Sequence, residues 1–311
     1  MEATPSTERA RLAIAGARAN VAMKLGSQPR GDVARNNAFA GLLLLSIVIA
    51  LVGLLALLIQ AGIEGAPAIG TNLITESPSS IDTANAGFRP ALIGSVMMIV
   101  LVIVMIVPLG VGSAIYLEEF ADGTKWWNRI IELNIQNLAA VPSIIYGILG
   151  LGLIVRGPLD LGFILLAGAI TLSLLVLPIV IIAGREAIRA VPPSIREGSL
   201  ALGATQWQTI RRQVLPAAIP GVATGVILAV SRALGETAPL LLVGATVFVT
   251  FDPEPLDGNY SALPVQIFQY ATRPQDDFQT LAAAGIMLML VVLIAMNSVA
   301  IWLRNRYEQK W

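Results

Sequence analysis

Six long apolar stretches constrain the fold of this chain more than any other feature of its sequence. A helix needs about 20 consecutive apolar residues to cross the hydrocarbon core of a bilayer. The first stretch, AFAGLLLLSIVIALVGLLALLI, contains no charged residue. We therefore predict an all-α, polytopic membrane protein with six transmembrane helices, at residues 38–60, 90–117, 138–156, 161–184, 217–250 and 279–303. Kinks are expected at four prolines within them: Pro108, Pro142, Pro178 and Pro220.

The composition supports a membrane protein and excludes several kinds of chemistry. The chain is 56% hydrophobic and 13% charged, whereas an ordinary soluble domain has about 25% charged residues. It has no cysteine and no histidine, which excludes disulfides, thiol nucleophiles, imidazole bases and the usual zinc or haem ligand sets. The net charge of zero argues against a nucleic-acid partner. The sequence also lacks a Gly-rich phosphate loop followed by Lys-Ser or Lys-Thr, so we predict no P-loop nucleotide site.

The distribution of basic residues predicts the orientation. If the N-terminus is cytoplasmic, only Arg89, Arg156 and Arg273 of the 20 lysines and arginines fall in the outside segments. Lys and Arg resist translocation, so both termini are predicted to be cytoplasmic. The outside loop at 251–278 is acidic and Pro-rich, and it suits either a docking segment or a solvated connector.

The predicted organisation has three parts. Residues 1–37 form a basic cytoplasmic arm, either a helix on the anionic inner leaflet or a disordered tail, and not a cleavable signal peptide. Residues 38–303 form the membrane domain, and 304–311 form a cytoplasmic tail. Within the domain, residues 185–216 form the longest cytoplasmic loop.

That loop contains the signals for two short helices. Ser194 with Glu197, and Thr205 with Gln208, each match a capping box, in which the first side chain caps the helix and the fourth caps it back. Gly203 lies between them and can adopt the left-handed conformation that ends a helix. The first helix carries leucines among small residues, which would fit a groove in another protein. The alternative is an ordinary hairpin that rests on its own membrane domain.

The fifth apolar stretch contains an unusual pair of charges, Arg232 and Glu236. A charge near the bilayer centre costs about 2.5–3.5 kcal/mol, so the two need partners or water. At a spacing of four residues they share one helical face and neutralise each other. Gly221 and Gly225 lie on the same face and permit close approach of another helix. That face is predicted to point toward a partner helix or an aqueous path, although the pair could also simply hold helices together.

The cytoplasmic loop resembles the EAA loop of the membrane subunits of binding-protein-dependent ABC importers. Glu197, Gly203 and the Leu215-Pro216 pair match the pattern, whereas Gly198 and Ser199 replace its two alanines and Gln213 replaces its isoleucine. The resemblance implies a six-helix domain of the type I importer kind and a coupling surface that inserts into a cleft of a cytoplasmic ATPase. That surface would consist of Glu197, Gly198, Ser199, Leu200, Ala201, Leu202, Gly203 and Ala204.

A second stretch, SRALGETAPLLLVG, is similar to the phosphate permeases of that superfamily, and its GETAPL part favours the PstA type over the PstC type. The resemblance implies phosphate import across a bacterial plasma membrane, with Arg232, Glu236 and Thr237 on the translocation pathway. It implies a homologous PstC-type permease chain, two copies of a PstB-type ATPase and an extracytoplasmic PstS-type binding protein as partners, besides membrane lipid. ATP and Mg would be bound by the ATPase, and this chain would bind no cofactor.

Three other functions remain open at this point. A permease for sulfate or molybdate would need the same kind of arginine. An ion-coupled secondary transporter would use Arg232 and Glu236 as a relay and would need no ATPase. An intramembrane enzyme would be restricted to a carboxylate mechanism, because histidine, cysteine and a Gly-x-Ser-x-Gly motif are absent.

Overall fold

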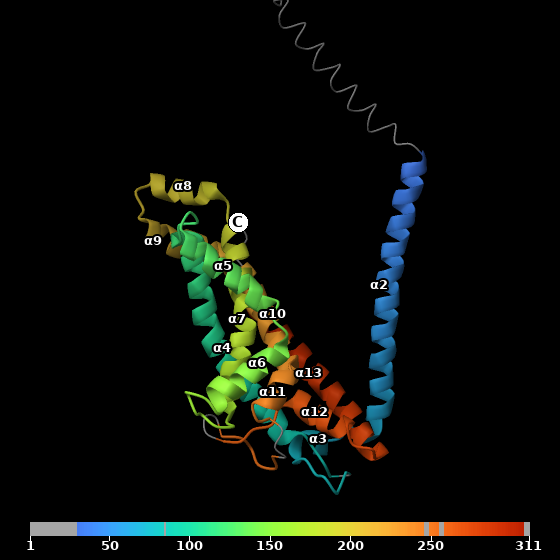
Figure 1. Cartoon of the computed structure of the whole chain (residues 1–311). Helices are drawn as coiled ribbons and strands as arrows, with labels where there is room; N and C mark the ends of the chain where they lie inside the picture. The colour runs from blue at the N-terminus through green and yellow to red at the C-terminus, as the bar shows by residue number, and fades with distance from the viewer. Residues whose placement is uncertain (1–29, 84, 246–248, 255–257, 308–311) are drawn as a thin grey trace, which may run out of the picture. The chain divides into compact units, whose positions relative to one another are not determined.

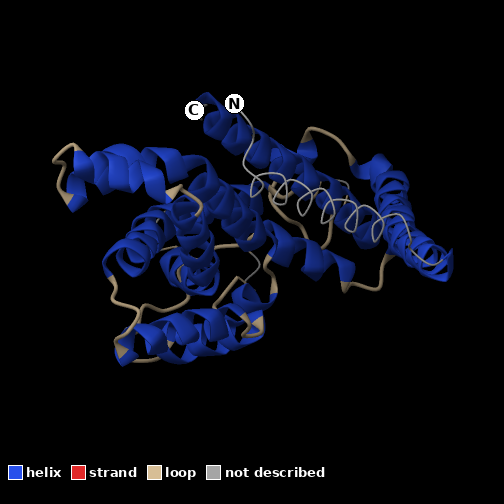
Figure 2. Cartoon of the chain, turned by 90° about the horizontal axis from the view of Figure 1, so that it is seen from above, coloured by secondary structure: helices blue, strands red, loops and turns tan. Residues whose placement is uncertain are grey.

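The computed structural model describes residues 30–83, 85–245, 249–254 and 258–307, and within these ranges all regular structure is helical (Figure 2). The all-α prediction is confirmed. The α-helices are α2 (Arg30–Gly65), α3 (Asn72–Thr75), α4 (Arg89–Ile115), α5 (Trp126–Ala139), α6 (Ser143–Leu149), α7 (Leu165–Arg189), α8 (Pro193–Ala201), α9 (Gln206–Thr209), α10 (Leu215–Gly235), α11 (Ala238–Leu242), α12 (Leu263–Ala271) and α13 (Asp276–Tyr307) (Figure 1).

The contacts divide the chain into two units, residues 1–60 and 61–311. The described part of the first unit is α2, which begins at Arg30 and therefore takes in the end of the predicted cytoplasmic arm. Most of that arm, residues 1–29, lies outside the described residues. The core and the candidate site described below belong to the second unit.

Among the described residues, five helices are long and apolar enough to cross a membrane: Arg35–Ala68, Arg89–Phe120, Leu165–Arg189, Gln206–Gly235 and Asp276–Arg306. A sixth crossing would consist of α5 and the segment Ser143–Val155 together, which meet at an angle of 107°. The kink predicted at Pro142 within the third span, 138–156, is therefore confirmed as a sharp bend, whereas the polar helix α5 before it was not predicted as part of this span. The bend falls at Pro142, whose ring disfavours a helical conformation at the preceding residue, and α5 is more polar than the apolar segment after it.

The fifth predicted helix, 217–250, is also interrupted. It ends at Gly235, and Glu236 has an extended conformation with ψ of 118°. The chain then starts the short helix α11, with a proline in its first turn. Gly235 favours a helix end and Pro239 cannot continue one. Pro108, Pro178 and Pro220, in contrast, lie inside α4, α7 and α10.

The core of the second unit is the packing of α4 and α10 against α7 (Figure 1). Val102, Val176, Val180 and Ala229 lie in its centre and are essentially inaccessible to solvent. A side chain at Gly221 would collide with Ala187 of α7, and one at Gly225 with Ala183 of α7. The predicted close approach at the Gly-x-x-x-Gly pair is confirmed, because these glycines allow the two backbones to meet.

Aromatic packing closes the end of the bundle where α4 begins, and we call this the aromatic end. Phe88, just before α4, lies edge-on to Tyr270 of α12 at 5.3 Å between ring centroids. Tyr270 stacks on Phe278 of α13 at 5.6 Å. Phe88 and Tyr270 are fully buried. The interpretation of 251–278 as a solvated connector is therefore wrong for α12, which lies in this core.

Candidate functional site

Helices α8 and α9 form a helical hairpin, residues 193–209, at the other end of α4. Gly203 joins them with φ of +84°, a left-handed conformation that glycine adopts without steric cost. Thr205 Oγ1 accepts from the Gln208 N–H at 3.3 Å, and Gln208 Oε1 accepts from the Thr205 N–H at 2.9 Å. The second predicted capping box is confirmed.

The first predicted capping box is wrong. Helix α8 starts at Pro193, so Pro192 is the N-cap and Ser194 already lies in the first turn, where its side chain makes no capping bond. Pro193 has the backbone angle that a first helical position requires and no N–H that would need a partner. The double proline therefore sets the start of α8 and leaves the serine without that role.

The predicted coupling residues lie together on this hairpin and most of them are exposed. Leu202 is 91% exposed and Leu200 is 49% exposed. The hydroxyl of Ser199 forms a hydrogen bond of 2.9 Å with that of Thr209 on α9. The hairpin also carries a shallow groove of about 410 Å³ between its helices. An apolar surface of this kind on a small helix is suited to docking into another protein.

Two acidic residues that our sequence reasoning missed hold the end of α4 to its neighbours, Glu119 to the hairpin and Glu118 to the end of α7. Glu118 and Glu119 lie in a π-helical turn, Tyr116–Phe120, that extends α4. Glu118 accepts from Arg189 Nε at 2.9 Å and from Arg185 Nε at 3.4 Å. Glu119 accepts from Arg196 Nη2 at 2.8 Å. A signal was present in the sequence, since paired acids follow one span and three arginines occur at 185–196.

Glu118, Arg185 and Arg189 also border an open cleft of about 530 Å³ with charges of both signs. Arg185 bridges Glu118 to Glu132 of α5, with its Nη1 at 3.0 Å from Glu132 Oε1. The π-helical turn, α5 and the end of α7 are thus joined by ionic contacts. Such a network fixes the relative orientation of the elements it joins more than it adds stability.

Arg232 and Glu236 form the predicted ion pair, with Arg232 Nε at 3.1 Å from Glu236 Oε1. The arrangement differs from the prediction, because Glu236 lies just beyond the end of α10 and not on its helical face. The side chain of Arg232 is 44% exposed within this chain, whereas that of Glu236 is 15% exposed. The guanidinium is thus anchored on one side and open on the other.

The ion pair lies where two interrupted helices meet. Pro239, just after the end of α10, contacts Gly147 of the bent α5–α6 pair so closely that no side chain would fit there. Thr237 is partly buried and caps no backbone N–H with its side chain. Interrupted helices leave backbone groups without helical partners, and in a membrane such groups persist only inside protein or beside water. The structure therefore brings Arg232, Glu236 and Thr237 together at a polar break.

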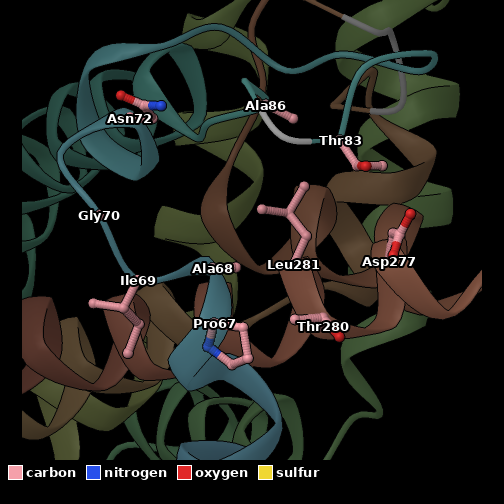
Figure 3. Close-up of a pocket in the computed structure, with 10 residues that line it drawn as sticks. All are labelled: Pro67, Ala68, Ile69, Gly70, Asn72, Thr83, Ala86, Asp277, Thr280 and Leu281. Atoms are coloured by element: carbon pink, nitrogen blue, oxygen red, sulfur yellow. The ribbon is translucent and has the colours of Figure 1, made fainter.

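A further pocket of about 460 Å³ lies near the aromatic end (Figure 3). Asp277, Thr280 and Leu281 reach it from α13, while Thr83 and Ala86 come from the segment before α4. The described residues that line this pocket include no arginine or lysine. It is therefore unsuited to hold an anion, in contrast to the polar break at Arg232.

Comparison with known proteins gives consistent results. Residues 106–309 match the family described as binding-protein-dependent transport system inner membrane component. The chain is 38% identical over 210 residues to phosphate transport system permease protein PstA 1 of Mycobacterium tuberculosis, covering 66% of this chain and 67% of that protein. It is 35% identical over 269 residues to the PstA protein of Haemophilus influenzae, covering 84% and 91%.

Solved structures show the same fold at lower identity. A chain of a bacterial ABC transporter that imports the acidic polysaccharide alginate has a TM-score of 0.61 and 16% identity, covering 89% of this chain and 98% of that one. A chain of the MetNI methionine ABC transporter has a TM-score of 0.56 and 17% identity, covering 71% and 95%. These likenesses show a type I importer permease fold.

Proposed function

The chain belongs to the family of binding-protein-dependent transport system inner membrane components, and we propose from this premise that it imports inorganic phosphate. Members of the family are transport subunits, and a separate ATPase subunit hydrolyses the ATP. The phosphate assignment is supported by the names of the relatives, which are phosphate permeases at 35–38% identity. Its physical support is the exposed guanidinium of Arg232 at the polar break.

The chemistry of Arg232 suits transient contact with phosphate. A guanidinium donates two parallel hydrogen bonds to a tetrahedral oxyanion. Glu236 already occupies one side of the group, with 3.1 Å between Arg232 Nε and Glu236 Oε1. An incoming anion must compete with this carboxylate, so it binds weakly enough to leave again, as conduction requires. Thr237 offers a hydroxyl next to the pair.

The hairpin is proposed to be the contact with the ATPase. Residues Glu197 to Ala204 form its exposed part, and the described helix continues from Gln206 to Gly235. A displacement of the hairpin would therefore be carried along one helical path to the break at Glu236. ATP binding would close the ATPase subunits, move the hairpin and switch the bundle between its two openings.

The partners follow from the same premise. Family membership implies an ATPase and a binding protein. We propose two PstB-type ATPase copies, a PstS-type binding protein and a PstC-type permease chain alongside this one. The hairpin and both termini would lie in the cytoplasm, and the aromatic end would face the binding protein. A pull-down from membranes that recovers no ATPase would contradict this assembly.

Uptake by Arg232 variants tests the phosphate pathway. In vesicles that contain the assembled transporter, we expect Arg232→Gln to reduce phosphate uptake by about tenfold or more, because a charge-assisted hydrogen bond is lost. Arg232→Lys keeps the charge but loses the forked geometry, so its phosphate uptake should lie between that of the unmodified transporter and that of Arg232→Gln. The matched control is Arg306→Gln, an exposed arginine near the end of α13. Full uptake by both Arg232 variants would exclude the pathway role.

Competition by sulfate and molybdate separates phosphate from the closest alternative. In the same vesicles, excess sulfate or molybdate should leave uptake of labelled phosphate nearly unchanged if phosphate is the cargo. Strong competition together with uptake of labelled sulfate would instead assign a different oxyanion permease. Uptake without any ATPase present would assign a secondary transporter.

A further inference from the structure

We propose that Glu119 is a positioning residue that ties the hairpin to the ends of α4 and α7, so that all three move together when the ATPase moves the hairpin. The proposal rests on the proposed function, because it takes the hairpin to be the ATPase contact. It assigns a role to a carboxylate that lies outside both the hairpin and the polar break.

Arg196 of α8 makes polar contacts with residues of two other elements. Its Nη2 and Nε lie 2.8 Å and 3.2 Å from Glu119 Oε1. The same guanidinium donates to the carbonyl oxygen of Val191 at 2.6 Å and to that of Ile188 at 2.8 Å. Because α7 ends at Arg189, these carbonyls belong to its last turn and the residues after it. One side chain thus joins α8 to α7 and to the extension of α4.

The other helix of the hairpin, α9, also binds Glu119. Gln206 Nε2 of α9 donates to the backbone carbonyl of Glu119 at 2.8 Å. Glu119 is therefore held by α8 through its side chain and by α9 through its backbone. Its neighbour Glu118 is held by Arg189, whose Nη2 lies 3.0 Å from Glu118 Oε2. The acidic turn is the place where α4, α7 and both hairpin helices meet.

The rest of the attachment between α8 and the bundle is apolar. Apart from these polar bonds, α8 packs on the bundle through Ile195, which lies against a small apolar cluster that includes Ala114, Ile188 and Val214. Apolar contacts are non-directional, so a helix held only by them can rotate or slide. The guanidinium–carboxylate bond has a defined geometry, and both side chains are largely buried, at 24% and 10% exposure. It therefore fixes the orientation of α8.

Coupling efficiency distinguishes this role from a merely structural one. In the assembled transporter, Glu119→Gln and Arg196→Lys should lower the phosphate imported per ATP hydrolysed by about tenfold, the change expected when one charge-assisted hydrogen bond is lost. The ATPase should stay bound and should still hydrolyse ATP. The matched control is Glu186→Gln, which removes the carboxylate of an exposed pair with Arg189 on α7. An unchanged ratio of phosphate imported to ATP hydrolysed in the two test variants would overturn the proposal. This includes the case in which import and hydrolysis fall in parallel.

A reversible cross-link gives a second, independent test. The chain contains no cysteine, so Glu119→Cys with Arg196→Cys introduces the only thiols in this subunit. We expect the reduced double variant to hydrolyse ATP with little import. Bridging with a short bis-methanethiosulfonate reagent should restore import, and dithiothreitol should abolish it again. The unmodified transporter with the same reagent controls for thiols in the partner subunits.

The outcomes separate the two proposals. Import by the reduced double variant at the unmodified level would show that the tie is unnecessary. Loss of import on bridging would show that the hairpin must separate from α4 during transport. Both results would overturn the positioning role while leaving phosphate import intact. If the unmodified complex imports no phosphate under ATP, the proposed function itself fails, whatever the variants do.

Discussion

At the hairpin end, α4 is joined to its neighbours by largely buried ion pairs, whereas at the aromatic end buried rings make the main contact and the ion pair between Arg89 and Asp252 lies at the surface. Glu118 and Glu119 bind Arg185, Arg189 and Arg196 over distances of 2.8–3.4 Å. At the other end, Phe88 packs against Tyr270 with no exposed area on either side chain. The same helix thus ends in two different kinds of attachment.

This difference indicates which end holds its position and which end moves as a unit with the hairpin. Close-packed interiors lose dispersion contacts as soon as a gap opens. The buried rings therefore allow α4 only one closely packed position. The ion pairs at the hairpin end have a defined geometry and join the hairpin to α4 and α7, so these elements move together when the hairpin is displaced. We infer that the aromatic end is the fixed point of the bundle and that the hairpin end transmits displacement.

The largest expected effect tests the aromatic end as the stable part. Phe88→Ala would remove a fully buried ring and leave a cavity, which costs about 3–5 kcal/mol. We expect the apparent midpoint of thermal unfolding of the purified transporter to fall by about 6 °C or more. The control Phe268→Ala changes a phenylalanine of α12 that is 47% exposed and should have a small effect. Equal midpoints for the two variants would remove the distinction between the ends.

A smaller effect is expected from overpacking the same core. A Cβ on Gly285 of α13 would lie 2.5 Å from Phe88 Cζ and 2.9 Å from Ile267 Cγ1. Gly285→Ala should therefore destabilise by about 1–3 kcal/mol, even though alanine is the better helix former. Gly112→Ala in α4 is the matched control, because no atom lies within 4 Å of its new Cβ. The control should be neutral or stabilising. If Gly285→Ala left the thermal midpoint unchanged, the aromatic end would be able to rearrange around the added methyl group.

The sequence predicted the apolar segments well, because hydropathy is a local property of each segment. It predicted their continuity less well. Pro142 and Pro108 carry the same local signal, yet the first lies at a 107° bend and the second lies inside a helix. Two features distinguish the surroundings of Pro142: α5 is polar, and Gly147 is in close contact with Pro239. Such contacts join residues far apart in the chain and cannot be read from a local pattern.

The candidate site was predicted to a similar degree. The pairing of Arg232 with Glu236 followed from their spacing and from the cost of a lone charge in a bilayer. The end of α10 between them was not predicted. The long apolar run 217–250 outweighed the helix-ending signal of Gly235 in our sequence reasoning. Glu119 was missed because its partner Arg196 lies 77 positions away, so the acids and the arginines are each visible in the sequence but only the fold pairs them. The hairpin, which depends on local turn chemistry, was predicted in its second half.

The smallest expected effect concerns that local chemistry and separates the hairpin itself from its attachment. Thr205→Ala removes the bond that the threonine hydroxyl accepts from the Gln208 N–H in the α9 cap, at a cost of about 1 kcal/mol. Because the hairpin is held to the bundle through Glu119, we expect the loss to stay local. Amide hydrogen exchange should rise at residues 205–209, while the thermal midpoint of the transporter hardly changes. Ser194→Ala is the matched control, since its hydroxyl makes no capping bond in α8, and exchange should stay as it was. If Thr205→Ala lowered the thermal midpoint as much as Gly285→Ala does, the hairpin end would belong to the rigid core, and the contrast between the two ends would fail.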